Sequence, residues 1–439
     1  MTAYLLEHAW VDGELRHDLT VTIELGRFAD VDGPTQRGAT RLPGLTVPGL
    51  ANVHSHAFHR ALRARAQDRG SFWQWRDRMY TLAERLDPDR YRELATAVFR
   101  EMVAAGITSV GEFHYLHHQV GGVPYDEPNV MGTALVEAAR DAGLRIALLD
   151  TCYLAGGIGQ PAEGVQQQFS DGSAEEWQQR TDELTADLDG DVVVGAAVHS
   201  VRAVPLADMR LVAEWADRFE TPLHVHLSEQ VAENEECLEA YGRTPTELLA
   251  EAGVLTDRTT VVHATHLTDL DLVRLGAAGL TACLCPTTER DLGDGIGPAG
   301  ALADAGVRLA LGSDSHAVVD LLEEARGVEL HERLRDGVRG RFDAPALLRA
   351  ATVDGHAALG FPDAGRIAVG ARADLVTLDL GSPRTAGCGP SPETAVFAAS
   401  AADVTHVVVA GEVRHRAEET EEVGRRLDEV VRRLWEEEP

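Results

Sequence analysis

Short apolar runs alternate with longer amphipathic stretches through the middle of the chain. Residues 129–142, 206–219 and 268–278 place apolar side chains at helical spacing, between runs of β-branched and aliphatic residues. Such near-continuous apolar runs are typical of strands in a parallel sheet whose outer face is covered by helices. Eight strands of this kind are predicted: Thr46–Val53, Ile107–Phe113, Leu144–Thr151, Val192–Val198, Pro222–Leu227, Thr259–His263, Leu280–Cys285 and Val307–Gly312.

Eight strand–helix units predict an α/β fold, a (β/α)8 barrel over residues 46–361. In such a barrel the functional side chains lie at the carboxyl ends of the strands. The alternative is an open, doubly wound sheet, which would normally carry a glycine-rich phosphate turn after its first strand. Histidines stand at that place in this chain, and we therefore favour the barrel.

The two ends of the chain have a different pattern. Residues 1–45 and 362–416 contain shorter alternating runs between Gly and Asp turns, namely TVTIEL, DLVTLDL and THVVVAGEV. We interpret both segments as strands of one small β-sandwich beside the barrel. The tail, residues 417–439, predicts an amphipathic helix because its apolar residues share one helical face: Val423, Leu427, Val430, Val431 and Leu434.

Composition and charge narrow the possible partners. The 439 residues are 44% hydrophobic and 25% charged, an ordinary balance for a globular protein with a large core. The net charge of -31 argues against binding nucleic acid, whose phosphates would be repelled. The N-terminal segment has no basic stretch followed by an apolar run, and no apolar run is long enough to cross a bilayer. We expect a cytoplasmic protein without a membrane partner.

The five cysteines are scattered, which favours free thiols in a reducing compartment over a disulfide framework. Cys283 and Cys285 form a C-x-C pair inside the apolar run LTACLC. Because no second cysteine pair exists, we interpret this pair as strand packing and not as metal ligation.

The first predicted barrel strand ends in His54-Ser55-His56. Alternate residues of a strand point the same way, so both imidazoles can reach one ion at the barrel mouth. An H-x-H pair alone is weak evidence, because two buried structural histidines would give the same pattern.

Three further strand ends carry the same kind of chemistry. The fifth strand delivers His226, with Glu229 three residues on, the sixth delivers His263, and the eighth delivers Asp314 after a Gly-Ser turn. Imidazole nitrogens together with a carboxylate suit a borderline divalent ion such as zinc, with one position left for water. The ion would lower the pKa of that water, so that hydroxide becomes available near neutral pH.

Two of these strands also hold a competing histidine. His224 alternates with His226, but His226 has the better distance to Glu229 and is the preferred ligand. His266 follows His263 beyond the strand end, and we assign it to a loop or to a supporting position.

The motifs PGLANVHSHAF, HVHLSE, VVHATH and GSDSH resemble those of the amidohydrolase superfamily, and GRIAVGARADLVTLD resembles its returning sandwich segment. The resemblance covers nearly the whole chain. Members with two metal ions usually carry a carboxylated lysine on the fourth strand, and DVVVGAAVHS has no lysine. The resemblance therefore implies one zinc ion per chain, with four ligands: His54, His56, His226 and Asp314.

The same resemblance implies that Glu229 and His263 handle protons. We expect Asp314 and His263 to accept the proton of the attacking water and Glu229 to deliver a proton to the leaving nitrogen.

Within the superfamily, the segments SFWQWRDRMY, GEFHYLHH, HSVRAV and LGDGIGPA together resemble the formimidoylglutamate deiminase family. The resemblance implies that Arg76, Tyr115, His199 and Arg202 bind substrate. Many members carry a glutamine that contacts substrate after HSHAF, whereas this chain has His59, which we include among the substrate-binding residues.

The expected reaction is the hydrolysis of N-formimino-L-glutamate to N-formyl-L-glutamate and ammonia, a step of histidine degradation. Two arginines suit this anionic amidine, because each planar guanidinium can donate paired hydrogen bonds to a carboxylate. Two alternatives stay open: a deaminase of a cyclic amidine (a purine, pterin or pyrimidine) and a non-catalytic metal- or ligand-binding barrel. The last would be expected to lack Glu229, His263 or Asp314. We also expect a homodimer.

Overall fold

The computed structural model of the protein describes residues 2–34, 38–67, 72–185 and 190–436. Eight parallel strands form one sheet, and each overlaps one of the eight strands that the apolar runs predict. The order along the sheet follows the chain, as the (β/α)8 prediction requires. The strands are β5 (Leu50–Ser55), β6 (Ile107–His114), β7 (Arg145–Cys152), β10 (Val192–Val198), β11 (Leu223–Leu227), β12 (Thr259–His263), β13 (Thr281–Leu284) and β14 (Arg308–Leu311).

The barrel is nearly closed by contacts between β5 and the residues that follow β14. The Asp314 amide donates to the His54 carbonyl at 3.0 Å, and the His56 amide donates to the Asp314 carbonyl at 3.2 Å. Beside them, Asn52 Nδ2 donates to Ser313 Oγ at 2.7 Å, and the Ser313 amide donates to Asn52 Oδ1 at 2.9 Å. The last and first strands are therefore joined at the residues for which the sequence predicts metal chemistry.

The first predicted strand, Thr46–Val53, is divided between two sheets in the structure. Its first residues end β4 (Thr40–Pro48), which pairs with β15 (Leu375–Leu378), and the barrel strand begins at Leu50. Gly49 lies at the crossing, where a Cβ atom would collide with side-chain atoms of Thr108 and Asp374. The apolar run is continuous because both strands are buried, so hydrophobicity alone did not show the change of sheet.

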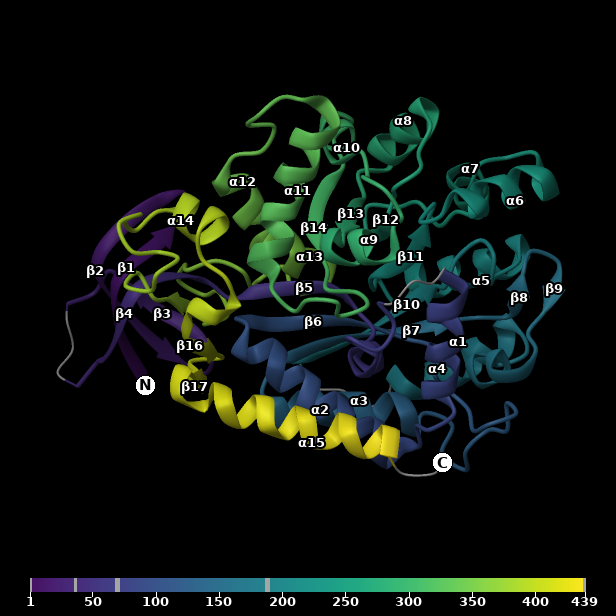
Figure 1. The fold of residues 1–439 in the computed structure, drawn as a ribbon, viewed down its shortest axis with the longest axis horizontal. Coiled ribbons are helices and arrows are strands. Elements are labelled where there is room, and N and C mark those ends of the chain that lie inside the picture. The colour runs from purple at the N-terminus through teal and green to yellow at the C-terminus, as the bar shows by residue number, and fades with distance from the viewer. Residues whose placement is uncertain (1, 35–37, 68–71, 186–189, 437–439) are drawn as a thin grey trace.

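The second sheet unites both ends of the chain beside the barrel (Figure 1). Its seven strands are antiparallel except where β1 and β4 run parallel, and it carries a hydrophobic core of its own. Besides β4 and β15 it contains β1 (Thr2–Val11), β2 (Glu14–Glu24), β3 (Arg27–Val31), β16 (Val404–Val409) and β17 (Glu412–Arg416).

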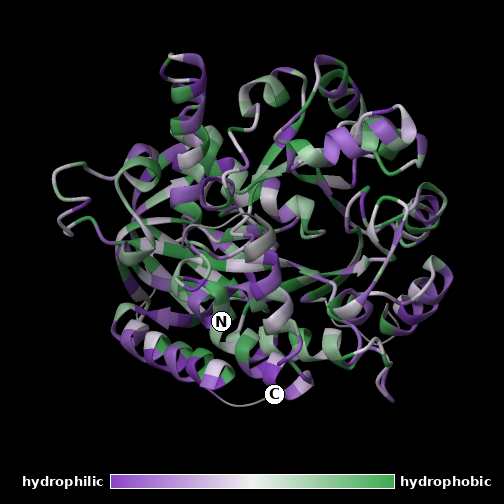
Figure 2. Cartoon of the chain, turned by 45° about the vertical axis from the view of Figure 1, so that its right-hand side comes forward, coloured by the Kyte–Doolittle hydropathy of each residue, from purple (hydrophilic) through white to green (hydrophobic). Residues whose placement is uncertain are grey.

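The outer helices begin and end at residues that stabilise helix termini. α8 (Asp269–Ala278) starts at Thr268, whose side chain accepts from the Asp271 amide, and stops at Gly279 with a φ of 65°. Apolar residues gather on the central strands, and hydrophilic residues line the outer helices (Figure 2). The larger helices are α1 (Phe72–Ala83), α2 (Pro88–Ala104), α3 (Val130–Ala142), α4 (Ala174–Leu184), α5 (Leu206–Arg218), α6 (Val231–Tyr241), α7 (Pro245–Glu251), α9 (Pro286–Leu292), α10 (Ala299–Asp304), α11 (Leu321–Asp336), α12 (Ala344–Arg349) and α14 (Pro392–Phe397).

The tail forms α15 (Thr420–Glu436), which lies along α2 (Figure 1). Leu427, Val430 and Leu434 are its buried residues, on the apolar face that the spacing predicts. Across the described part of the chain, no helix combines the length and apolar character that a membrane crossing needs.

Candidate active site

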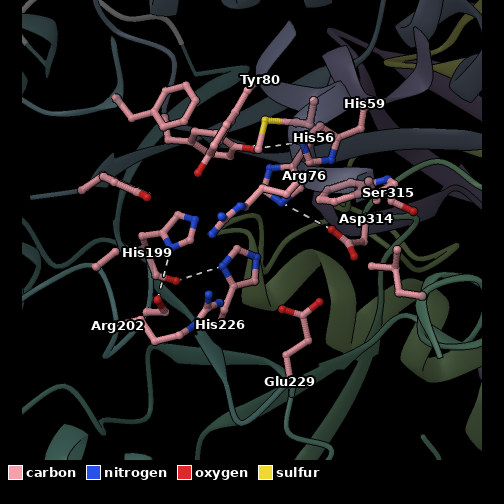
Figure 3. Close-up of a pocket in the computed structure, with 18 of the residues that line it drawn as sticks. His56, His59, Arg76, Tyr80, His199, Arg202, His226, Glu229, Asp314 and Ser315 are labelled. Carbon is pink, nitrogen blue, oxygen red and sulfur yellow. Dashed lines mark hydrogen bonds and ion pairs between the residues drawn. The ribbon is translucent and has the colours of Figure 1, made fainter. Parts of the chain in front are cut away.

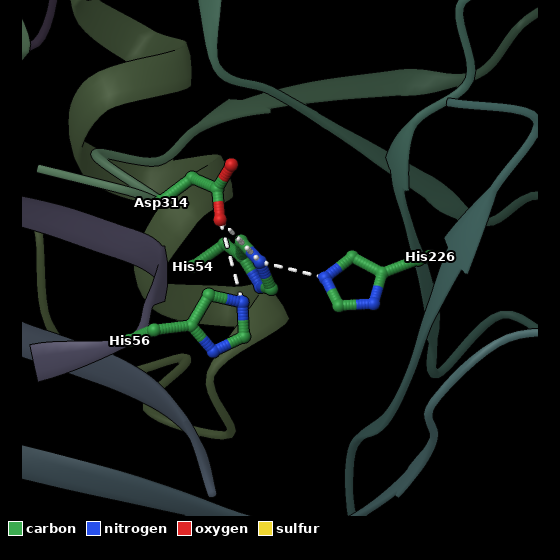
Figure 4. Close-up of side chains that lie close together, drawn as sticks. All are labelled: His54, His56, His226 and Asp314. Atoms are coloured by element: carbon green, nitrogen blue, oxygen red, sulfur yellow. Dashed lines mark hydrogen bonds and ion pairs between the residues drawn. The ribbon is translucent and has the colours of Figure 1, made fainter. Parts of the chain in front are cut away.

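Four side chains converge at the carboxyl ends of the barrel strands (Figure 4). His54 lies in β5 and His56 directly follows it, His226 lies in β11, and Asp314 lies in the turn after β14. One ligand atom from each lies within 4.8 Å of the others. Asp314 Oδ1 is 3.2 Å from His54 Nε2 and 3.4 Å from His56 Nε2, and His226 Nε2 is 3.1 Å from His54 Nε2.

The backbone fixes which ring nitrogens of two of these histidines face the cluster. His56 Nδ1 donates to the Phe113 carbonyl at 3.0 Å, and His226 Nδ1 donates to the His199 carbonyl at 2.9 Å. Because a carbonyl oxygen only accepts, Nδ1 carries the proton in each ring and Nε2 offers a lone pair. This arrangement is typical of histidines that bind metal ions.

The cluster fits a divalent cation on the chemistry of its donors. Burial lowers the pKa of His54, His226 and His56, the last to about 3, so the three rings are neutral and able to coordinate. Burial opposes the charge of Asp314, but the hydrogen bond with His54 and the positive charge of nearby His263 outweigh it and lower the pKa of Asp314. Three nitrogen lone pairs and a carboxylate oxygen within 4.8 Å match the preference of zinc.

The predicted proton-handling residues lie beside this cluster. His263 Nε2 is 3.8 Å from Glu229 Oε1 and 3.8 Å from Asp314 Oδ2, so one imidazole lies between two carboxylates. His263 and Asp314 have φ values of 67° and 42°, a left-handed conformation that costs about 1–3 kcal/mol outside glycine. Strain of this kind often occurs at functional sites, where the surrounding structure holds it in place.

The three groups differ in their tendency to hold a proton. Burial raises the pKa of Glu229, which favours its neutral acid form. Burial opposes the charge of His263, but the carboxylates of Glu229, Glu289 and Asp314 outweigh it and raise its pKa well above the usual value. Glu229 and His263 therefore compete for a proton across 3.8 Å, and groups that can exchange a proton in this way are suited to acid–base chemistry.

A cavity of about 770 Å³ of empty space opens over these residues (Figure 3). Arg76 and Arg202 line it together with Glu229 and Asp314, so the structure places two guanidinium groups and the proposed reaction centre around one space. Arg76 lies over the ring of Tyr80 at 5.4 Å. The predicted substrate-binding residues all line this cavity: His59, Arg76, Tyr115, His199 and Arg202.

His59 is held by another of the predicted substrate-binding residues. Its Nε2 lies 2.9 Å from the Tyr115 hydroxyl, within hydrogen-bond distance, and its ring is 4.6 Å from that of His56. The side chain thus fills the corner between the metal-ligand cluster and Tyr115. Its contact with substrate stays a prediction.

The two competing histidines lie outside the ligand cluster. His224 Nε2 faces the Ala358 carbonyl at 3.4 Å, and His266 Nε2 faces the Asp294 carbonyl at 2.8 Å. Each is paired with backbone, which agrees with the preference for His226 as a ligand and for His266 as a loop residue.

Sequence reasoning missed three residues around the site. Glu112 accepts from Ser55 Oγ and the Ala57 amide, both at 2.6 Å, and so supports the segment that carries the ligand histidines. Glu289 lies 3.5 Å from His263 Nδ1. Tyr153 lines the cavity with its ring 4.7 Å from that of His199.

One signal could have found two of these residues. Tyr153 directly follows β7, and Glu112 lies two residues before the end of β6, so both are at carboxyl ends of barrel strands. A position at the carboxyl end of a strand also identified the predicted metal ligands. Glu112 and Tyr153 were not chosen because no motif accompanied them.

A second group of metal-ligand residue types, His114, His117 and Asp150, lies within 4.8 Å of one another. Both Asp150 oxygens accept from Arg180, at 2.8 Å each. A guanidinium in this position already satisfies the carboxylate and repels a cation, so we interpret this group as structural. The five cysteines are free. Cys283 is buried in β13, and Cys285 is buried directly after it, with a ligand atom within 4.8 Å of those of His263 and Asp314.

The chain matches the family described as "Amidohydrolase family" over residues 45–414. This match spans the barrel and the C-terminal strands of the second sheet, and it leaves out β1, β2 and β3. The chain belongs to the amidohydrolase family. Members are generally metal-dependent hydrolases, which agrees with the donor cluster at the barrel mouth.

Relatives narrow this assignment to deamination. The chain is 38% identical to formimidoylglutamate deiminase of Pseudomonas aeruginosa over 402 residues, which cover 87% of this chain and 88% of that protein. It is 30% identical to 5-methylthioadenosine/S-adenosylhomocysteine deaminase of Halobacterium salinarum over 379 residues, covering 85% and 82%. This amidohydrolase is a hydrolase of carbon–nitrogen bonds, and hydrolytic deamination is the reaction that both relatives support.

A solved structure shows the same fold. The crystal structure of an amidohydrolase from Brucella melitensis superposes with a TM-score of 0.90 at 30% sequence identity, covering 99% of this chain and 100% of that one.

Proposed function

We propose that this amidohydrolase hydrolyses N-formimino-L-glutamate to N-formyl-L-glutamate and ammonia. One observation carries the proposal: Arg76 and Arg202 line the same cavity as Glu229 and the metal-ligand cluster. The substrate has a formimino group at one end and two carboxylates at the other. Guanidinium groups bind carboxylates through paired, charge-assisted hydrogen bonds. The similarity to formimidoylglutamate deiminase supports the same substrate.

We further propose one zinc ion per chain, held by His54, His56, His226 and Asp314. The donor set supports zinc, and the absence of a lysine in β10, Val192–Val198, supports a single ion. A zinc ion at this site would polarise water and lower its pKa.

We assign the proton transfers of this reaction to three side chains around the cluster. Asp314 and His263 accept the proton of the attacking water, and their carboxylate and imidazole lie 3.8 Å apart. Glu229, whose pKa burial raises, delivers a proton to the terminal nitrogen of the formimino group. Protonation there makes ammonia the leaving group and leaves the formyl product.

The proposal includes the partners of the enzyme. The partner is a small anionic amidine. Because a protein of net charge -31 does not attract a dianion through its overall field, we assign the binding of this substrate to a local positive pocket. We propose no nucleic-acid or membrane partner and a place in histidine degradation. The homodimer and the cytoplasmic location stay predictions.

A second candidate is a deaminase of a cyclic amidine, which the similarity to 5-methylthioadenosine/S-adenosylhomocysteine deaminase favours. The experiment that separates the two measures ammonia release from N-formimino-L-glutamate and from a panel of purines, pterins and pyrimidines, with zinc content measured on the same sample. We expect rapid release from the formimino compound. Release only from a cyclic amidine would replace the proposal, and bound zinc without any turnover would indicate a binding protein.

A further inference from the structure

The buried carboxylate of Glu233 bonds both Arg202 and the residue before Glu229. Glu233 lies in the first turn of α6, and its side chain is 0% exposed. One oxygen, Oε2, accepts from Arg202 Nε at 2.9 Å. The other, Oε1, accepts from the Ser228 amide at 2.8 Å. Glu233 is absent from the residues that line the catalytic cavity and belongs to an adjoining pocket that shares Arg76 and Arg202 with it. Because Arg202 and the Ser228 amide occupy its two oxygens, this carboxylate acts on the catalytic cavity through these neighbours.

The bond to Ser228 fixes the backbone directly before Glu229. Ser228 has a φ of 49°, a left-handed conformation that a non-glycine residue adopts only when its surroundings hold it. Its amide is held by Glu233, and its carbonyl accepts from the His266 amide at 3.1 Å. Because Glu229 is the next residue, loss of the Glu233 bond would release the conformation that directs its carboxyl toward the cavity.

The bond between Glu233 and Arg202 fixes the orientation of the Arg202 guanidinium. A single arginine side chain has several rotatable bonds, and holding Nε sets the plane of the whole group. With Nε directed at Glu233, the terminal nitrogens are the donors that Arg202 offers to an anion in the cavity. The Arg202 side chain is 23% exposed, so this ion pair is partly shielded from water.

We propose that Glu233 is a positioning residue that couples carboxylate binding at Arg202 to proton transfer at Glu229. The inference rests on the proposed function for the identity of the substrate. One rigid side chain holds both groups, so a substrate carboxylate bound by Arg202 and a formimino group facing Glu229 are placed at a fixed separation. Fixed placement of this kind lowers the entropic barrier to reaction.

The experiment compares Glu233→Gln with Glu235→Gln, a matched control that removes the same charge from the same helix. Glu235 is exposed on α6 and lines neither the catalytic cavity nor the adjoining pocket that contains Arg76 and Arg202. The zinc-loaded variants are assayed for ammonia release from N-formimino-L-glutamate and from N-formimino-4-aminobutyrate and N-formimino-L-2-aminobutyrate, each of which lacks one carboxylate. Zinc content and thermal unfolding are measured on the same samples.

We expect Glu233→Gln to raise KM and lower kcat together, with kcat/KM for the full substrate reduced by about 30-fold, the scale expected when one partner of a buried charge pair is lost. On the compound that lacks the carboxylate held by Arg202, Glu233→Gln should lower kcat/KM less. The loss that remains there is the one caused by the changed position of Glu229. A merely structural role would lower the active fraction, and with it kcat, and leave KM unchanged. Glu235→Gln should stay within about twofold of wild type, as expected for an exposed substitution.

A double substitution tests the coupling itself. If Glu233 acts through Arg202, Arg202→Met with Glu233→Gln should cost less than the product of the two single penalties. Purely multiplicative penalties, or a Glu233→Gln enzyme with the KM and kcat of the Glu235→Gln control, would overturn the proposal.

Arg202→Lys tests the same coupling should Glu233→Gln fail to fold, because lysine cannot bond Glu233 and a carboxylate through separate nitrogens of one planar group. Coupling predicts that this variant loses kcat, through Glu229, even on the truncated substrates, and a kcat equal to wild type would contradict it. A wild-type enzyme that is inactive on N-formimino-L-glutamate would reject the proposed function, whereas an active wild type with an indifferent Glu233→Gln variant would reject the coupling alone.

Discussion

Backbone hydrogen bonds join His54, His56 and Asp314 at one part of the site. Arg76 and Arg202, in contrast, reach the same cavity with long side chains from separate segments. At the metal-ligand end, the amide of Asp314 bonds the carbonyl of His54, and the amide of His56 bonds the carbonyl of Asp314. At the carboxylate-binding end, Arg76 projects from α1 and Arg202 from the turn after β10. Closure of the barrel therefore sets the positions of the donors.

This difference separates chemistry from substrate choice. Donor atoms fixed by backbone hydrogen bonds keep their spacing as long as the barrel folds. The arginines depend on side-chain partners, Tyr80 beside Arg76 and Glu233 beside Arg202, so a substitution there can change recognition while the barrel stays intact. We expect substitutions at the metal-ligand end to abolish the reaction. Substitutions at the carboxylate-binding end should change the substrate preference.

The largest effect is expected from Asp314→Asn. The change removes a charged ligand and a proton acceptor at once, so kcat should fall by about 10³-fold or more. Ammonia release and elemental analysis measure the two losses, with the exposed Asp269→Asn as a control. Two tightly bound metal ions in the wild-type enzyme would contradict the single-ion site, and unchanged turnover in the variant would remove Asp314 from the mechanism.

Glu229→Gln should affect the reaction without affecting the metal site. Glu229 belongs to the cavity but not to the four-residue cluster, so zinc content should equal that of wild type. Loss of its proton should lower kcat by about 10²-fold, the usual scale for general acid–base catalysis. Steady-state kinetics and elemental analysis on one preparation test both statements, and a variant with full kcat would show that another group protonates the leaving nitrogen.

Arg76→Met and Arg202→Met should lower kcat/KM for N-formimino-L-glutamate by at least about 30-fold. Loss of one partner of a desolvated charge pair costs about 2–5 kcal/mol, at 1.36 kcal/mol per tenfold. The penalty should be much smaller on a formimino compound without the carboxylate that the arginine holds. Four rates, wild type and variant on full and truncated substrate, form a cycle. Equal penalties on both substrates would show that the arginine does not contact that carboxylate.

The last prediction concerns stability instead of turnover, at a residue that supports the metal-ligand end. Burial raises the pKa of Glu112 to about 8, above the ordinary value of 4.5. The folded state then binds more protons than the unfolded chain between these values, so this group stabilises the fold below pH 4.5 and its contribution is lost as pH rises to about 8. The slope is at most about 1.4 kcal/mol per pH unit.

Glu112→Gln should flatten this dependence, because the amide imitates the neutral carboxyl. Thermal unfolding of the metal-free wild type and variant across the range from weakly acidic to weakly alkaline pH measures the difference. Equal slopes for the two proteins would show that Glu112 is ionised in the folded state.

Local patterns in the sequence were enough for most of the fold. The eight apolar runs correspond to β5, β6, β7, β10, β11, β12, β13 and β14, and the spacing of Leu427, Val430 and Leu434 gave the buried face of α15. Strand ends also carry His54, His56, His226 and Asp314 to one cluster, because parallel strands of a barrel direct their carboxyl ends to one face. The division of residues 46–53 between two sheets was missed, since both strands are buried and equally apolar.

The sequence by itself determined the approximate positions of the eight barrel strands, of α3, α5, α8 and α15, and the identity of the residues at the barrel mouth. Hydrophobic periodicity and strand-end position are properties of neighbouring residues. Only the tertiary structure decided the pairs that join distant segments: Asn52 with Ser313, His59 with Tyr115, and Glu233 with Arg202. Such pairs depend on how the barrel closes and on how the side chains are oriented. Residues that are distant in the sequence come together only through the tertiary fold, so their spacing along the chain does not predict these bonds.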